Sequence, residues 1–366
     1  MTRKKEFNLD VIAPHTVKKF ELISAYVSSW AEKLLNYSKC DGIVYIDCMS
    51  NAGEYIVKKT SNIIQGTSLL VVSILLNCAR KYRNKTIKIY FNDFDKNKIE
   101  HLENRINELY PKKPSNLLIQ YSIKDASIFL KELKRNRTNN LNTLLIYDPY
   151  KADIDWLALD PYLNTWGEVI INHVIHDSVR GIKQTKDPEK ISRYERTYEK
   201  SIDDLVNMDK KEYQEHVDKI IRRHIHPSLN AFLAYSVFYI STNVQVYNLI
   251  HVTHNEKGFL LFKNIAWKIA GGQAFVQENW LDKNQPKLFG YEPEHYSNYN
   301  INYSVYDIAD YIVAKFSDRG VISFNDIFDD LKHHPIFPND GFRREIKKAL
   351  KEYHNCTITK TMLYFP

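Results

Sequence analysis

The chain has 366 residues, of which 44% are hydrophobic and 26% are charged, so it can bury one large core or split into a few domains. Its formal net charge of +7 comes from 51 basic and 44 acidic residues, which permits a polyanionic partner without requiring one. The four cysteines form no C-x-x-C pair, the amino terminus lacks the apolar core of a signal peptide, and no apolar run can cross a bilayer. We therefore expect a cytoplasmic protein with reduced thiols and no membrane partner.

Helices and strands alternate along the first half of the chain. An apolar stripe predicts a helix with Thr16 as its N-cap; the stripe consists of Phe20, Ile23, Val27, Trp30 and Leu34. The apolar run 43–46 predicts a buried strand that ends in Asp47, and the segment 68–80 predicts a buried helix. Strands at 87–95, 117–121, 142–150 and 168–174 follow, with helices between them. This rhythm is typical of an α/β fold with a doubly wound parallel sheet.

The second half of the chain predicts an insertion and a separate module. Residues 176–226 are polar and highly charged at helical spacing, which indicates a helical insertion forming a cap or lid. Two β-rich runs, 235–242 and 244–253, predict a hairpin, and a helix follows at 257–269. The main domain would then comprise residues 1–175 and 227–272, and 273–302 would be a connector. Residues 303–366 predict three helices (305–316, 324–331 and 341–353) and a final strand, a winged-helix-like module.

Three acids follow successive predicted strands: Asp47, Asp93 and Asp125. In a doubly wound sheet such positions converge on the crevice that binds nucleotides. The second acid can accept both ribose hydroxyls of a nucleoside, and the third can accept the exocyclic amine of adenine. The residues after Asp47 let the backbone approach a ligand closely: Ser50, Asn51, Ala52 and Gly53. Because no Walker pattern is present, the predicted ligand is an adenosine compound without a triphosphate, although three strand-end caps would give the same pattern.

The fourth strand ends in Asp148, Pro149 and Tyr150. A carboxylate and a rigid proline carbonyl can accept hydrogen bonds from an exocyclic amine, and the neighbouring ring can stack on a flipped base. The second proline of the usual amino-methyltransferase pattern is absent. A strand terminator with a half-buried tyrosine is the alternative.

Two further sets of residues bear on ligands. The histidines occur in pairs (His173 with His176, His224 with His226, His251 with His254), but no neighbouring carboxylate or cysteine completes a set, so no metal site is predicted. The last predicted helix carries cations on one side: Arg343, Arg344, Lys347, Lys348 and Lys351. Such a face can bind nucleic-acid phosphates, and a solvated helix face is the alternative.

The order of these motifs resembles the three-Cys-motif partner proteins (TcmP family), which are similar to class I S-adenosylmethionine-dependent methyltransferases. The resemblance covers residues 13–269. It rests on the opening helix H-T-V-K-K-F-E-L-I-S-A-Y-V-S-S-W, the loop Y-I-D-C-M-S-N-A-G-E-Y, the step G-T-S, and the strand ends F-N-D-F-D-K-N and I-Y-D-P-Y. T-H-N-E-K-G followed by K-N-I-A-W-K resembles the last strand and helix. Asn51 stands where the family loop usually has its first glycine, and Ser68 replaces a proline.

The resemblance implies a Rossmann-like domain that binds S-adenosyl-L-methionine, a nucleic-acid acceptor and a bacterial setting linked to phages or mobile elements. It implies that these residues bind the cofactor: His15, Thr16, Lys19, Asp47, Ser50, Asn51, Ala52, Gly53, Asp93, Phe94, Asp125 and Ala126. Asp148, Pro149 and Tyr150 would be catalytic. The three cysteines of the family name belong to a radical-SAM-like protein, so such a partner is implied as well.

Two functions remain open from the sequence. In the first, a methyltransferase, Asp47 and the 50–53 loop face the methionine moiety, Asp93 the ribose and Asp125 the adenine. Asp148 would then orient an amine of the nucleic acid. In the second, the chain is a catalytically weak or inactive methyltransferase-fold module that binds and regulates another protein, as in antiviral defence. Asn51 in the cofactor loop favours the second.

Overall fold

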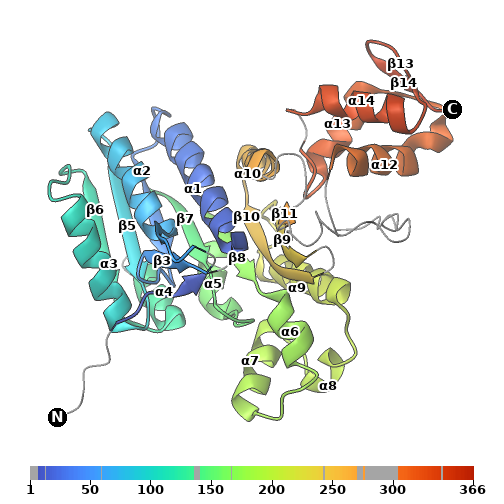
Figure 1. The fold of residues 1–366 in the computed structure, drawn as a ribbon. Helices are drawn as coiled ribbons and strands as arrows, with labels where there is room; N and C mark the ends of the chain where they lie inside the picture. Colours follow the sequence, from blue (N-terminus) through green and yellow to red (C-terminus); the bar gives the residue numbers. More distant parts are fainter. Residues whose placement is uncertain are drawn as a thin grey trace, which may run out of the picture.

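The computed structural model describes residues 7–12, 14–58, 60–135, 141–165, 167–241, 244–269, 275–276, 304–338 and 341–366. Its centre is an eight-stranded sheet with the strand order β11-β9-β10-β8-β7-β2-β5-β6 (Figure 1). The strands β2 (Gly42–Asp47), β5 (Thr86–Asn92), β6 (Leu117–Ser122), β7 (Asn142–Tyr147) and β8 (Glu168–His173) run parallel. The chain order reverses at β2, which lies between β5 and β7, so the predicted doubly wound, Rossmann-like α/β fold is confirmed.

An antiparallel hairpin extends the sheet beyond β8. The strands β9 (Phe232–Ser241) and β10 (Val244–Thr253) pair with each other, as the sequence predicts, and β10 also pairs antiparallel with β8. The short β11 (Phe275–Val276) lies on the outer side of β9. Since β10 runs against β8, it ends at the edge of the sheet where the parallel strands begin.

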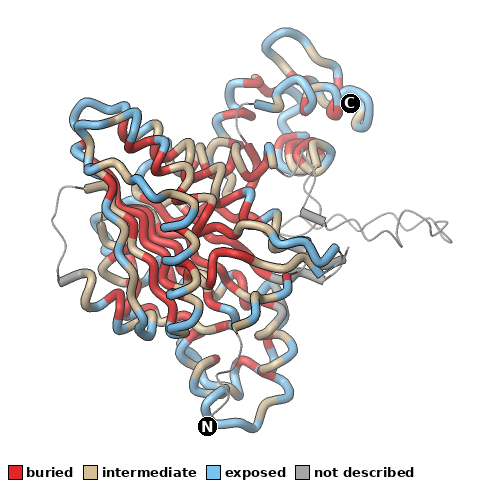
Figure 2. Tube along the Cα trace, turned by 60° about the vertical axis from the view of Figure 1, so that its left-hand side comes forward, coloured by how far each residue is buried: buried red, intermediate tan, exposed pale blue. Residues whose placement is uncertain are grey.

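Helices cover both faces of the sheet because the strands are apolar on both sides. Along β2, Ile43 and Tyr45 pack into one buried cluster, and Val44 and Ile46 pack into the other. Figure 2 shows the central strands in red, the colour of buried residues. The first cluster contains residues of α1 (Pro14–Leu35), α2 (Thr67–Lys81), α3 (Lys96–Leu109) and α10 (Glu256–Ile269). The second contains residues of α4 (Ala126–Arg135) and α5 (Trp156–Leu163).

Two details near the amino terminus differ from the prediction. The helix α1 begins at Pro14, so Thr16 lies inside its first turn and its assignment as the N-cap is wrong. Proline suits the first helical position because it has no N–H to leave unpaired. In addition, the residues between β2 and α2 are not a simple turn. They form β3 (Glu54–Val57) and β4 (Ile63–Gln65), which make a small separate sheet with β1 (Val11–Ile12).

The predicted insertion is helical. It consists of α6 (Ile175–Gly181), α7 (Pro188–Tyr198), α8 (Ile202–Leu205) and α9 (Lys210–His224) and follows the carboxyl end of β8. Buried hydrogen bonds fix it to the main domain: Trp156 Nε1 donates to the carbonyl of Thr197 (2.8 Å), and His173 Nε2 lies 2.8 Å from the Tyr198 hydroxyl. Burial lowers the pKa of His173 to about 3, so its ring is neutral near pH 7.

The tail forms a compact module of helices and short strands. Its helices α12 (Val305–Phe316), α13 (Phe324–His333) and α14 (Arg343–Tyr353) agree with the three predicted helices. A 3-10 turn, η1 (Ser317–Arg319), follows α12. In place of one final strand, β12 (Val321–Ser323), β13 (Thr357–Ile358) and β14 (Met362–Tyr364) form an antiparallel sheet. Of the predicted connector 273–302, all but 275–276 lies outside the described residues.

A buried lysine joins this module to the main domain. Lys263 of α10 is 1% exposed, and its Nζ donates to the carbonyls of Leu331 (3.1 Å), Lys332 (2.9 Å) and His334 (2.6 Å). These carbonyls end α13, where helical acceptors lack intrahelical donors and the helix dipole favours a cation. The backbone N–H of Tyr235 also donates to the carbonyl of Pro335 (3.0 Å). The main domain therefore supplies the cap of a helix in the module.

The module and the carboxyl ends of the parallel strands lie at opposite edges of the sheet. The helix α10 follows β10, which ends where the parallel strands begin, whereas α6 follows the carboxyl end of β8. Figure 1 accordingly shows the module beyond α10 and the insertion at the other end of the sheet. Within the described part of the chain, none of the helices combines the length and apolar composition needed to span a bilayer.

We expect Lys263→Met to loosen the module. The substitution keeps an aliphatic stem but leaves three carbonyls without their donor, so the free energy of unfolding should fall by about 2–4 kcal/mol. Amide hydrogens of α12–α14 should also exchange faster. Denaturant unfolding and hydrogen exchange measure the two effects. Lys268→Met, at an exposed position of the same helix, is the control, and equal exchange in both variants would contradict the assignment.

Candidate functional site

Acids gather where three adjacent parallel strands end. In the register of the sheet, Asp47 lies opposite Phe91 of β5 and Ile146 of β7. Asp93 and Asp148 each follow two residues after these partners, so the three carboxylates come from one edge of the sheet. Of the three acids predicted to converge, the structure therefore brings together Asp47 and Asp93, and Asp148 joins them.

Asp47 is almost completely buried, with 3% of its surface exposed. Burial raises its pKa from the ordinary 3.8 to about 7, and the negative charges of Asp148 and Asp93 add to the effect. The backbone N–H of Met49, 3.2 Å from Oδ1, and the charge of Lys19 oppose the rise. Near neutral pH this carboxyl is consequently poised between its neutral and ionised forms.

Asp148 is held by two side chains from other elements. Lys19 of α1 places its Nζ 2.6 Å from Oδ2, and Asn172 of β8 donates through Nδ2 to Oδ1 at 2.6 Å. Lys19 is 8% exposed, and its ammonium lies 5.2 Å from the centre of the Tyr247 ring. Lys19 is predicted to bind the cofactor, and the structure pairs it with the predicted catalytic acid. Asn172 and Tyr247 were not predicted as site residues, although a polar residue inside the apolar run of β8 was a usable signal for Asn172.

The predicted cofactor loop is a tightly fixed turn. Asn51 (φ 58°) and Gly53 (φ 77°) both have left-handed backbones, a conformation that glycine and asparagine tolerate best. A Cβ on Gly53 would meet Leu102 Cδ1 at 2.5 Å. Ser68 Oγ donates to the carbonyl of Ser50 (2.7 Å), and the side chain of Asn51 contacts Asp10 (2.7 Å). Asn51 therefore supports the left-handed backbone conformation of this loop.

Asp93 is tied to this loop. Its Oδ2 accepts from the backbone N–H of Asn51 (3.1 Å), and its Oδ1 accepts from that of Asp95 (3.0 Å). Burial raises its pKa above the ordinary value. The loop after β2 and the acid after β5 therefore form one connected unit.

The other predicted cofactor residues differ in how far they are buried. Asp125 is exposed and caps α4 by accepting from the backbone N–H of Ser127 (2.9 Å), and Ala126 is the first residue of that helix. Phe94 is 81% exposed. Thr16 is half-buried in α1, Ala52 is buried in the loop, and the side chain of His15 lies outside the described residues. Asp125 thus acts as the cap that the alternative reading anticipates, and its predicted contact with adenine stays a prediction.

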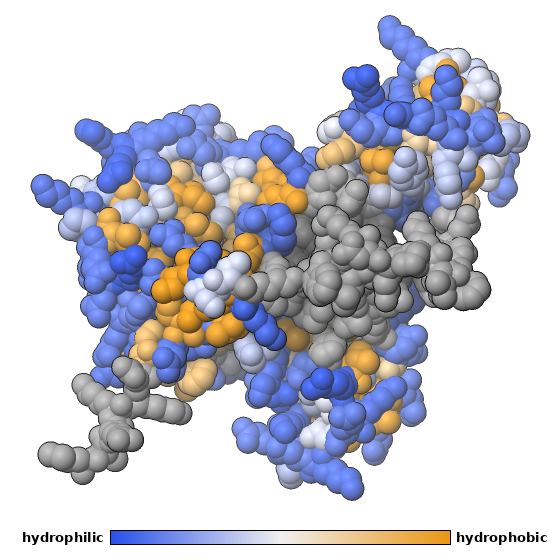
Figure 3. Space-filling model, viewed as in Figure 1, coloured by the Kyte–Doolittle hydropathy of each residue, from blue (hydrophilic) through white to orange (hydrophobic). Residues whose placement is uncertain are grey.

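Exposed apolar side chains follow the strand ends. Phe94 follows β5, Ile123 follows β6, and Ile128 lies in the first turn of α4; all three are exposed. Figure 3 shows hydrophobic side chains gathered where Figure 1 places β1, β3 and α4. After β7, Pro149 is buried and Tyr150 is 93% exposed, so the half-buried ring of the alternative reading is wrong. The edge therefore combines buried acids with exposed apolar and aromatic side chains.

Several buried polar atoms near this edge have no hydrogen-bond partner within the described part of the chain, among them two side-chain oxygens. Ser50 Oγ and Asn172 Oδ1 are buried without a hydrogen-bond partner. Buried polar atoms are normally paired, so these two indicate where a polar ligand would complete the site. Ser50 belongs to the predicted cofactor loop, and Asn172 contacts the predicted catalytic acid.

The histidine pairs serve other purposes. His224 lies 2.7 Å from both Asp160 and Glu199, so carboxylates that are distant in sequence do surround it. His251 contacts Glu168 (2.7 Å) and the Tyr26 hydroxyl (3.0 Å) inside the core. No group of three or more histidine, cysteine or carboxylate side chains suited to hold a metal occurs among the described residues.

Comparison with known proteins yields remote structural similarity alone. No protein-family model matches the chain, and no curated protein does. A Legionella pneumophila protein of family DUF519 is 10% identical with a TM-score of 0.42, covering 69% of this chain and 93% of that one. A class I S-adenosylmethionine-dependent methyltransferase assigned in Listeria monocytogenes has 10% identity, a TM-score of 0.33, and coverages of 64% and 60%. The O-methyltransferase TomG from Streptomyces achromogenes, whose structure was solved in complex with SAM, is 12% identical with a TM-score of 0.34. The match covers 63% of this chain and 78% of that one. At these values the fold assignment rests on the strand order of the sheet itself.

We expect Asp47→Asn to stabilise the protein at high pH. The pKa of Asp47 is about 7 in the folded state and ordinarily 3.8. At a pH between these two values, Asp47 keeps its proton in the folded state and has lost it in the unfolded state. Wild-type stability should therefore fall as the pH rises through this window. Asparagine is a neutral isostere of aspartate, so the variant does not lose stability as the pH rises. At pH 8 its free energy of unfolding should exceed that of the wild type by about 2–4 kcal/mol, and near pH 4 the two should be almost equal. Urea unfolding across the window measures the difference.

Asp203→Asn, at an exposed position of α8, is the control and should follow the wild type at every pH. An Asp47→Asn variant that is less stable than the wild type at pH 8 would refute the raised pKa.

Proposed function

We propose that the protein binds S-adenosyl-L-methionine at the carboxyl ends of β2 and β5 and transfers its methyl group to an amine beside Asp148, with nucleic acid as the acceptor. The observation that carries the proposal is the connected unit of Asp47, the 50–53 loop and Asp93 at the switch point of a doubly wound sheet. The buried, unpaired Ser50 Oγ in the same loop fits a ligand seated there.

Each residue has a proposed role toward the donor. Asp93 accepts the ribose hydroxyls, and the left-handed loop at Asn51 and Gly53 lets the backbone approach the methionine moiety. Asp47 faces the positively charged end of the donor, which favours its ionised form and so lowers its pKa from about 7. Phe94 and Asp125 flank the adenine from neighbouring strand ends. When bound, the donor supplies an electrophilic methyl group on a sulfonium.

Asp148 and Asn172 would position the acceptor amine. The lone pairs of Asp148 that Lys19 and Asn172 leave free can accept an amine N–H, and the unpaired Asn172 Oδ1 offers a second acceptor. A nitrogen lone pair oriented in this way would attack the methyl carbon. The electron pair of the broken carbon–sulfur bond would stay on sulfur, which becomes a neutral thioether, and the methylated amine would release its proton to solvent. Catalysis would thus consist mainly of positioning.

Two features support a nucleic-acid acceptor. Tyr150, two residues after Asp148, presents a free ring face on which a base can stack. The basic side of α14 offers cations to phosphates.

The alternative is a methyltransferase-fold module that binds the donor and regulates a partner, such as a radical-SAM-like protein. Its motivation is the pairing of both Asp148 oxygens by Lys19 and Asn172, which leaves the acid less free to accept an amine. Donor binding without methyl transfer to any extract would favour this alternative.

We expect calorimetry to detect S-adenosyl-L-methionine binding to the wild type. Asp93→Asn should weaken it by roughly 10- to 100-fold, since hydrogen bonds to a charged acceptor contribute about 1.5–3 kcal/mol each. Asp203→Asn is the control and should bind as the wild type does. If calorimetry detects no heat of binding at millimolar S-adenosyl-L-methionine, the proposal that the protein binds this donor is wrong.

We expect radiolabelled donor to mark nucleic acid in extracts, and Asp148→Asn to reduce the rate by about 100-fold or more while leaving donor affinity intact. The unchanged affinity separates a role in positioning the acceptor from a loss of the donor site. Label confined to protein would overturn the nucleic-acid acceptor, and an unaffected rate in the variant would overturn the assignment of Asp148.

A further inference from the structure

The outer side of α14 is a continuous basic surface. Its cations recur every three or four residues, so they lie on one face of the helix: Arg344, Lys347, Lys348 and Lys351. The opposite face, with Ile346, Ala349 and Leu350, is buried in the module. The helix is thus anchored along one side and presents the other side to solvent.

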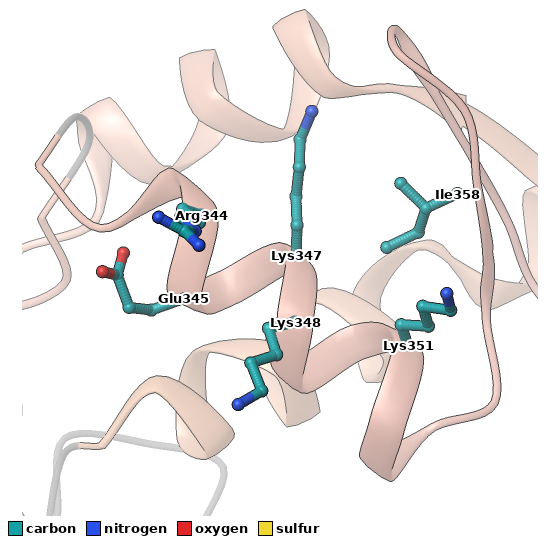
Figure 4. A pocket seen from close by; sticks show the side chains of 6 residues that line it. All are labelled: Arg344, Glu345, Lys347, Lys348, Lys351 and Ile358. Atoms are coloured by element: carbon teal, nitrogen blue, oxygen red, sulfur yellow. The ribbon is translucent and has the colours of Figure 1, made fainter.

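This basic surface borders a hollow of about 540 Å³ between α14 and the strand β13. The four cations, Glu345 and Ile358 line it, and Figure 4 shows them around the exposed side of the helix. Four positive charges against one carboxylate leave the hollow strongly positive. The hollow belongs to the module and lies away from the buried acids at the carboxyl edge of the sheet.

Contacts within the module hold the basic surface in shape without neutralising it. Lys347 Nζ lies 3.8 Å from the centre of the Phe324 ring and 3.3 Å from the carbonyl of Lys360, in the turn between β13 and β14. The nearest carboxylate oxygen to Lys348 is that of exposed Glu352, 3.9 Å away, and such surface pairs are weak. The helix and the β13–β14 hairpin are therefore in contact through Lys347, and together they are called the basic unit below.

We propose that this unit binds duplex DNA, with α14 in the major groove and the β13–β14 hairpin against the neighbouring phosphates. The major groove of B-DNA is about 12 Å wide and admits an α-helix, whereas the major groove of A-form RNA is deep and narrow. Arg344 and Glu345 lie in the first turn, where recognition helices contact base edges, and the lysines farther along the helix contact phosphates.

The position of the basic unit in the fold indicates that it binds DNA away from the candidate site. Lys263 ties the module to α10, at the edge of the sheet opposite the carboxyl ends of the parallel strands. DNA held by α14 is therefore distinct from an acceptor base positioned at Asp148. The inference rests on the proposed function in one respect: the proposed function names a nucleic acid as the acceptor, and the inference specifies that the protein binds duplex DNA.

Fluorescence anisotropy of the full chain, without methyl donor, tests the proposal. The probes are a DNA duplex of about two helical turns and an RNA duplex of the same sequence. The DNA should bind at least roughly tenfold more tightly than the RNA. Replacing Arg344, Lys348 and Lys351 together by glutamine should weaken DNA binding by roughly tenfold or more. It should also reduce the slope of log affinity against log salt by about two, because Lys348 and Lys351 are the replaced cations assigned to phosphates.

The matched control replaces three exposed cations of α9 by glutamine: Lys211, Lys219 and Arg222. This variant should bind DNA as the wild type does. Equal binding of RNA and DNA, an unaffected α14 variant, or an equal loss in the α9 variant would overturn the proposal. Because the assay contains no donor, its failure is distinct from a failure to bind S-adenosyl-L-methionine.

Discussion

The crowding of carboxylates at one edge of the sheet is the constraint on which the rest of the structure depends. Parallel strands all end at that edge, so Asp47, Asp93 and Asp148 lie close together and repel one another. The buried Lys19 neutralises part of this negative charge, because its Nζ lies 2.6 Å from Asp148 Oδ2. Burial and the remaining repulsion raise the pKa of Asp47 to about 7. The structure therefore holds unfavourable charge where a cationic ligand would relieve it.

The second organising feature is the separation of two charged surfaces. The acidic edge lies beside the helical insertion, and the basic side of α14 lies beyond α10 at the opposite edge. Lys263 connects the two parts, because its Nζ donates to three carbonyls at the end of α13 while its stem remains in the main domain. Burial lowers the pKa of this lysine to about 7. A partner held at one surface is not obstructed by a ligand at the other.

Sequence patterns predicted most of the main elements, because apolar periodicity reports directly which face of an element is buried. The strands β2, β5 and β7, the β9–β10 hairpin and the helices of the insertion and tail all fall where that periodicity indicates. The small sheet of β1, β3 and β4 was missed. Its strands are short and partly exposed, and β3 pairs with β1 from far earlier in the chain, so no local pattern marks it.

Sequence patterns were sufficient to identify the acids at the strand ends, because a parallel topology places every strand terminus at the same edge. How those acids are paired depends on contacts between distant elements. Lys19 and Asp148 are 129 residues apart, and their pairing depends on how α1 packs against the sheet. The pKa of Asp47 depends on burial and on charges from neighbouring strands, and the role of Asn172 depends on the register of β8 with β7. The pairing of Lys19, the pKa of Asp47 and the role of Asn172 all depend on distances between elements. The periodicity of a single segment does not encode such distances.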